Sequence, residues 1–125
     1  MERRYRPRIL AGYTKHISIP CGRIFVTINS IHGEEIEVFV RNEVNNPCLN
    51  AQNESITRLI SLALQYGVPT EEIVDQLSKI KCTGQKAWDN GKEITSCGDA
   101  IAACLSEFSE TINSNGSIIG YDGDD

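Results

Sequence analysis

The feature that most constrains the fold of this chain is a change in the spacing of its apolar residues near residue 45. Before that point apolar and polar residues alternate along the segments 13–20, 23–29 and 35–41, and this period of two is typical of strands. After it, apolar residues recur every three or four positions, which is typical of amphipathic helices. We therefore expect an α+β fold: a small antiparallel β-hairpin or meander sheet covered by two to three α-helices.

The second and third strands should form a hairpin. The segment 30–34, which includes His32 and Gly33, has the composition of a turn. Each strand keeps its apolar residues on one side, namely Ile24, Val26 and Ile28 on the second and Ile36, Val38 and Val40 on the third. Strands of this length need a covering layer, which the helices supply.

The first helix has clear start and stop signals. Asn45 and Asn46 precede Pro47, which is tolerated in a first turn, and Gly67 followed by Pro69 ends the helix. Its apolar positions recur at helical spacing and are expected to pack on the sheet: Ile56, Leu59, Ile60 and Ala63.

Two further helices should follow, separated by a loop at 82–93. Thr70 is a suitable N-cap for the first of them, and Thr95 or Ser96 for the second. The expected apolar sides are Ile73, Leu77 and Ile80 on the first, and Ile101, Leu105, Phe108 and Ile112 on the second.

The length of 125 residues suits a single domain. We place it at residues 13–112, between a basic arm at 1–12 and a flexible acidic tail at 113–125. The charges are Arg3, Arg4, Arg6 and Arg8 in the arm, and Asp122, Asp124 and Asp125 in the tail. We expect both ends to be solvated. The alternative is that the arm docks on an anionic partner or a neighbouring subunit.

Composition excludes several classes of function. A net charge of -5 argues against binding of duplex nucleic acid. The chain contains no apolar run of about 18 residues and no signal peptide, so we expect a cytoplasmic protein without a membrane partner. Neither His16 nor His32 completes a catalytic group, and no phosphate-binding glycine motif is present. We therefore assign no catalytic residue.

Several motifs keep a fixed order between residues 6 and 105. They are PCGRIFVTIN at 20–29, EVFV at 37–40, RLISLAL at 58–64, GVP at 67–69, EEIV at 71–74, IKC at 80–82 and TSCGDAIA at 95–102. In this order they resemble the TSCPD domain, found at the C-terminus of cobalamin-dependent ribonucleotide reductases and here expected to stand alone. Gly98 replaces the usual proline of that motif, and Asn45 to Cys48 replace a Gly-Gly-Cys.

The resemblance implies a noncatalytic nucleotide-binding or assembly module, because the catalytic barrel of the reductase is missing. Its partner would be a ribonucleotide reductase chain. An alternative is a phage-type sponge that sequesters a nucleotide-derived immune signal, with pockets between the subunits of a homo-oligomer. We expect oligomers because a small sheet exposes strand edges.

A candidate nucleotide site centres on the loop 82–96 and on helix N-termini, whose backbone donors suit phosphate. A base could stack on Trp88 while Arg58 or Lys92 meets a phosphate and Asn90 reads an edge. The candidate ligand-binding residues are Arg58, Trp88, Asn90, Lys92, Ser96 and Asp99. The alternative is that Trp88 anchors its loop to the core or to a dimer partner.

Four cysteines fall where TSCPD domains also carry cysteine, each at the end of an expected element: Cys21, Cys48, Cys82 and Cys97. If these ends converge, four thiolates could bind zinc, and the domain would then be a zinc-binding structural module. The missing close pairs favour the alternative that the cysteines pack as small apolar side chains. Cys48 and Cys97 are also candidate reactive thiols at helix N-termini, and Cys104 is expected in the core.

Overall fold

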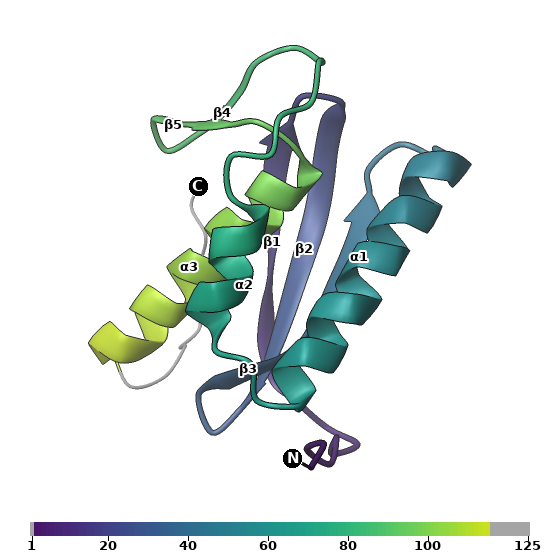
Figure 1. Ribbon diagram of the computed structural model, residues 1–125. Helices are drawn as coiled ribbons and strands as arrows, with labels where there is room; N and C mark the ends of the chain where they lie inside the picture. The colour runs from purple at the N-terminus through teal and green to yellow at the C-terminus, as the bar shows by residue number, and fades with distance from the viewer. Residues whose placement is uncertain (1, 116–125) are drawn as a thin grey trace.

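The computed structural model describes the backbone of residues 2–115 and the side chains of residues 2–110. The elements are β1 (Ala11–Ile19), β2 (Gly22–Ile31), β3 (Glu34–Asn42), α1 (Pro47–Gln65), α2 (Thr70–Leu77), β4 (Ala87–Asp89), β5 (Lys92–Ile94) and α3 (Cys97–Asn115). The first three strands form an antiparallel sheet in the order β1-β2-β3, and β4 pairs with β5. All three helices cover the same face of the larger sheet, and on that face α1 lies beside α2 and α3 (Figure 1). The expected α+β fold is confirmed.

The core lies between that sheet and the helices. The inner residues Ile24, Val26 and Ile28 of β2 have no exposed surface. Ile101, Leu105 and Phe108 of α3 are equally buried, so this part of the predicted stripe is confirmed, while the Ile112 side chain lies outside the described residues. Apolar side chains at these spacings therefore join the two layers into a single core.

The start of α1 follows its sequence signals. The Asn46 side chain accepts a hydrogen bond from the Leu49 N–H at 3.2 Å, and Pro47 is the first helical residue. Beyond the C-cap, Gly67 adopts a φ of +93°, a left-handed conformation that favours glycine. Both predicted boundaries of this helix are confirmed.

Three expectations about the helices are wrong. Pro69 occupies the N-cap position of α2, and the hydroxyl of Thr70 instead donates to the carboxylate of Glu35 at 2.9 Å. Ile80 lies beyond the end of α2 and is exposed. Leu59 is 69% exposed although it lies one residue before the buried Ile60, because the sheet covers only one side of α1.

Side chains of α1 cover the outer edge of β3. The hydroxyl of Ser61 accepts from the Val38 N–H at 2.9 Å and donates to the Val38 carbonyl at 3.2 Å. The Gln65 amide donates to the Ile36 carbonyl at 3.4 Å. The helix thus binds backbone groups that an edge strand would otherwise present to another strand.

The arginine arm contacts its own chain. Arg6 pairs with Glu37, Arg4 pairs with Glu34, and the Arg3 Nε donates to the side chain of Gln65 at 2.7 Å. The Arg4 N–H also donates to the Gln65 carbonyl at 2.8 Å. These residues of the arm therefore pack against the domain, where the sequence had suggested a solvated segment.

A short hairpin replaces most of the loop expected at 82–93. Asn90 and Gly91 join β4 to β5 with φ values of +51° and +81°, so both lie in the left-handed region. A two-residue Asn-Gly turn of this kind suits the twist of a β-hairpin. Lys15 fixes the hairpin to the fold, because its Nζ donates to Asp89 at 2.8 Å and to Glu107 at 2.7 Å.

Candidate functional site

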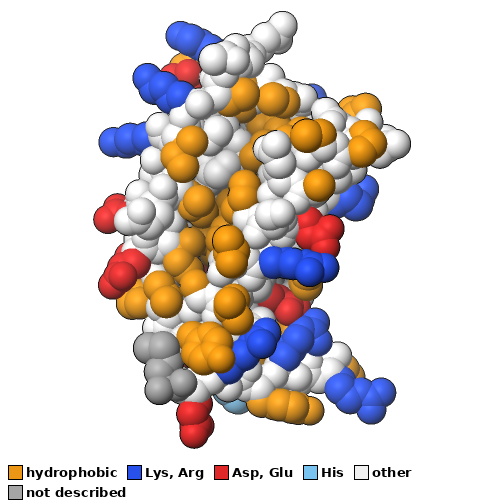
Figure 2. Space-filling model, turned by 45° about the vertical axis from the view of Figure 1, so that its right-hand side comes forward, with side chains coloured by type: hydrophobic (Ala, Val, Ile, Leu, Met, Phe, Trp, Pro, Cys, Tyr) orange, Lys and Arg blue, Asp and Glu red, His pale blue; other side chains and the backbone are white. Residues whose placement is uncertain are grey.

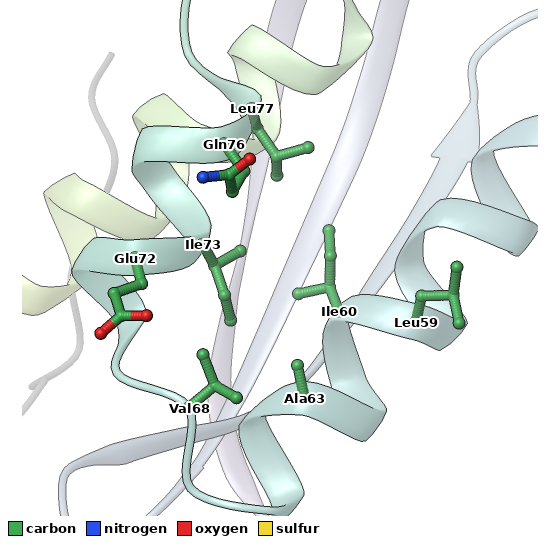
Figure 3. Close-up of a pocket in the computed structure, with 8 residues that line it drawn as sticks. All are labelled: Leu59, Ile60, Ala63, Val68, Glu72, Ile73, Gln76 and Leu77. Atoms are coloured by element: carbon green, nitrogen blue, oxygen red, sulfur yellow. The ribbon is translucent and has the colours of Figure 1, made fainter.

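An apolar groove lies between α1 and α2. Its volume is about 260 Å³, and its lining residues are Leu59, Ile60, Ala63, Val68, Glu72, Ile73, Gln76 and Leu77. Ile73 and Leu77 of α2 point toward Ile60 of α1, and Val68 closes one end of the space (Figure 3). Leu59 and Glu72 lie at its two rims (Figure 3). The groove is thus bounded by two helices that do not pack directly on each other at this point.

The groove opens on an exposed apolar surface. Figure 2 shows hydrophobic side chains gathered in a band down the middle of this face, with charged side chains mainly toward its margins. Leu59, Leu62 and Tyr66 extend the apolar surface along α1, where all three are exposed. Sequence analysis missed this site. The available signal was the spacing of these three residues, which forms a second apolar stripe beside the buried one.

Two of the predicted cysteine ligands lie in contact. The Sγ atoms of Cys21, in the turn between β1 and β2, and Cys82, in the loop after α2, are 3.6 Å apart. Both side chains are exposed. The hydrogen bond with Cys82 raises the pKa of the Cys21 thiol, and burial adds to the effect.

The other two cysteines do not complete a zinc site. Cys97 is partly buried at the start of α3, and burial raises the pKa of its thiol despite an opposing hydrogen bond from Asn53. Cys48 is exposed at the start of α1, with the Gln52 amide 3.7 Å from its Sγ. Among the residues described, no three His, Cys, Asp or Glu side chains are grouped so that they could hold a metal ion. The thiols as arranged therefore do not fit zinc. Cys104 is buried as expected, which raises its pKa to about 12.

A second hollow of about 200 Å³ adjoins Cys82. Its lining residues are Pro20, Lys81, Cys82, Gly84, Gln85, Lys86, Glu93, Ile94 and Thr95. Two lysines and one glutamate thus line the same hollow as Cys82. This surface joins the loop after α2 to β5 and to the end of β1.

The structure separates the residues of the predicted nucleotide site. Trp88, Asn90 and Lys92 share the β4–β5 hairpin, where Trp88 is 56% exposed and pairs across the strands with Glu93. Arg58 lies on α1, at the other side of the fold (Figure 1), and pairs with Glu54 of the same helix at 2.7 Å. The exposure of Trp88 also argues against an anchor in the core of its own chain.

Ser96 and Asp99 have structural partners. The hydroxyl of Ser96 accepts from the Asp99 N–H at 3.0 Å, which confirms Ser96 as the N-cap of α3. The Asp99 carboxylate accepts from the Lys79 N–H at 2.9 Å and from the Thr95 N–H at 3.0 Å. Both side chains are buried. They fasten the start of α3 to the residues that follow α2 and β5.

The model of the TSCPD domain family matches residues 2–109, which is most of the chain. The chain belongs to the TSCPD domain family. No curated protein and no solved structure matches this TSCPD domain. Family membership links it to proteins related to ribonucleotide reductase. Within residues 2–115, none of its helices has the length and apolar character needed to cross a bilayer.

Proposed function

We propose that this TSCPD domain is a noncatalytic assembly module, and that the groove between α1 and α2 binds a ribonucleotide reductase chain. The observation that carries the proposal is the apolar groove, which leaves Leu59 69% exposed beside the buried Ile60. An exposed apolar surface with a recessed centre is typical of protein-binding sites. The family relation gives the class of partner.

The groove favours an apolar segment with basic neighbours. A volume of about 260 Å³ accommodates one or two large apolar side chains. Burying such a side chain contributes about 1.5–3 kcal/mol. Glu72 lies at the rim, Glu71 beside it is exposed, and the chain carries a net charge of -5. Basic residues flanking the apolar anchors would therefore favour association.

Geometry favours assembly over nucleotide binding. The groove is lined mainly by aliphatic side chains, whereas a nucleotide site needs donors for phosphate and a stacking surface. Arg58, the expected phosphate donor, and Trp88, the expected stacking surface, lie on different sides of the fold. Binding of a nucleotide, including the sponge function, remains a prediction for Trp88, Asn90 and Lys92 alone. A change in Trp88 fluorescence on titration with nucleotides would support it.

Two matched variants test the proposal. Leu59→Asp places a charge at the groove, and Val44→Asp places the same charge at a residue of similar exposure, 70%, outside its lining. Binding to a purified cobalamin-dependent reductase chain that lacks its own TSCPD domain would be measured by biolayer interferometry. We expect Leu59→Asp to weaken binding roughly tenfold or more and Val44→Asp to leave it unchanged.

Three results would overturn the proposal. The first is failure of the unmodified domain to bind the reductase. The second is equal binding by the Leu59→Asp variant, with circular dichroism showing that it is folded. The third is self-association of the unmodified domain that Leu59→Asp abolishes, because the groove would then be occupied by a second copy of the chain.

A further inference from the structure

We propose that Cys21 and Cys82 form a site of reversible oxidation, where a small disulfide oxidant converts the two thiols into an intramolecular disulfide. The two residues are separated by 61 positions in the sequence, yet their Sγ atoms are 3.6 Å apart. A disulfide bond is about 2.05 Å long, so the sulfur atoms need to approach by only about 1.5 Å. Both side chains are exposed and so accessible to an oxidant.

The backbone holds the two cysteines together independently of their thiols. Gly84, two residues after Cys82, lies against Pro20, the residue before Cys21. A Cβ atom on Gly84 would lie 2.8 Å from the Pro20 carbonyl oxygen, so only glycine permits this approach without a shift. On the other side, the Cys82 N–H donates to the Thr95 carbonyl at 2.8 Å. On one side the loop is therefore fixed to the residue that follows β5, and on the other side it packs on the residue that follows β1.

The hollow beside Cys82 suits an anionic oxidant. Lys81 and Lys86 line it, with Glu93 as the opposing charge. Oxidised glutathione is a disulfide that carries carboxylates, and the two lysines would attract them. Transient disulfides of this kind are compatible with a reducing compartment, where they act as redox sensors.

The reaction balances as two thiol–disulfide exchanges. One cysteine loses its proton, and the resulting thiolate attacks a sulfur of oxidised glutathione, forming a mixed disulfide and releasing one glutathione thiolate. The second cysteine, also deprotonated, then attacks the protein sulfur of that mixed disulfide and releases the second glutathione. The protein loses two protons and two electrons, and one oxidised glutathione becomes two reduced glutathione molecules.

The cross-link would tie the turn between β1 and β2 to the loop that follows α2. Because the linked residues are far apart in the sequence, the bond also restricts the unfolded chain. Oxidation should therefore raise the midpoint of thermal unfolding.

The test uses the purified full chain, fully reduced and then incubated with oxidised glutathione. We expect mass spectrometry to show loss of two hydrogen atoms, with proteolysis yielding a peptide pair joined through Cys21 and Cys82. Cys82→Ser should instead accumulate a glutathione adduct on Cys21, and Cys21→Ser should accumulate one on Cys82. Cys48→Ser, which removes an exposed thiol at the start of α1, should still form the Cys21–Cys82 cross-link.

A second measurement examines the lysines. In the Cys21→Ser variant, adding Lys86→Glu should slow formation of the glutathione adduct at Cys82 several-fold. The difference between the rates with and without Lys86→Glu should shrink at high salt. Two results would overturn the proposal. One is stable glutathione adducts on both thiols of the unmodified chain without a cross-link. The other is zinc bound at one equivalent in the purified protein that protects Cys21 and Cys82 from oxidation.

Discussion

Arg6 holds Glu37 with two hydrogen bonds, from Nε to Oε1 at 2.7 Å and from Nη2 to Oε2 at 2.8 Å. The Glu37 side chain is only 4% exposed, and Asn29 donates a third hydrogen bond to it at 2.7 Å. Burial by itself would raise the pKa of Glu37. The hydrogen bonds from Arg6 and Asn29 outweigh burial and lower this pKa below its ordinary value of 4.5.

This pair gives a prediction for acid pH. Because the pKa of Glu37 is lower in the folded chain, its contribution to stability is present above the unfolded pKa and is lost as the pH falls through the folded pKa. Arg6→Ala should lower the midpoint of thermal unfolding at pH 7. The difference in midpoint between this variant and the unmodified chain should shrink below about pH 4. Arg8→Ala in the same arm is the control. An equal effect of Arg6→Ala at neutral and acid pH would contradict the prediction.

Asp99 gives a prediction about the residues that follow α2 and β5. Asp99→Ala removes the acceptor for the N–H groups of Lys79 and Thr95 at a position that is only 3% exposed. We expect the free energy of unfolding in urea to fall by about 1–3 kcal/mol. Asp99→Asn, which keeps one acceptor oxygen, should cost less. A larger loss in the asparagine variant would show that the two hydrogen bonds are not the cause.

Gly84 and Gly98 form a matched pair for alanine substitution. A Cβ on Gly84 would lie 2.8 Å from the Pro20 carbonyl oxygen, whereas a Cβ on Gly98 would find its nearest neighbours at 3.7 Å. Gly84→Ala should therefore destabilise the domain by about 1–3 kcal/mol. Gly98→Ala, in the first turn of α3, should be neutral or stabilising by up to about 1 kcal/mol. Equal stabilities of the two variants, measured by urea unfolding, would refute this account of Gly84.

The turn between β4 and β5 gives a prediction for Trp88. Asn90 has a φ of +51°, which alanine adopts only at a cost of about 1–2 kcal/mol. Asn90→Ala should therefore loosen the hairpin and change Trp88 fluorescence, whereas Asn90→Gly should preserve both. Hydrogen exchange at the β4–β5 amides would measure the opening. Unchanged exchange in the alanine variant would contradict the prediction.

Sequence alone predicted the elements whose signals are long and local. At the buried face of α3 and at the start of α1 at Asn46, several neighbouring residues all indicate the same structure. The β4–β5 hairpin was missed although Asn90-Gly91 is a strong turn signal, because strands of three residues carry almost no periodicity. The prediction that Leu59 packs on the sheet is wrong for a different reason. Helical spacing defines an apolar arc, but it does not show how much of that arc finds a partner.

The candidate sites were less predictable because they depend on distant segments. Cys21 lies directly before β2, as expected, whereas Cys82 lies in a loop five residues beyond the end of α2. Contacts between distant segments, among them the packing of Gly84 on Pro20, bring the two cysteines together. The grouping of Arg58 with Trp88 failed because each had been placed by its chemistry, without the position of α1 relative to the hairpin. Ser96 and Asp99 are polar residues at a helix start, a pattern that a ligand site and a helix cap share, and here their side chains accept hydrogen bonds from backbone N–H groups.

The hydroxyl of Ser61 has a consequence for how chains of this kind can stack. It binds both backbone groups of Val38, and Gln65 binds the Ile36 carbonyl, so a foreign strand that approaches β3 there finds its bonding positions taken. Cross-β fibrils need a sheet that can be extended on both sides. Here α1 acts as a terminator along β3, and templated growth of the sheet would have to start from β1.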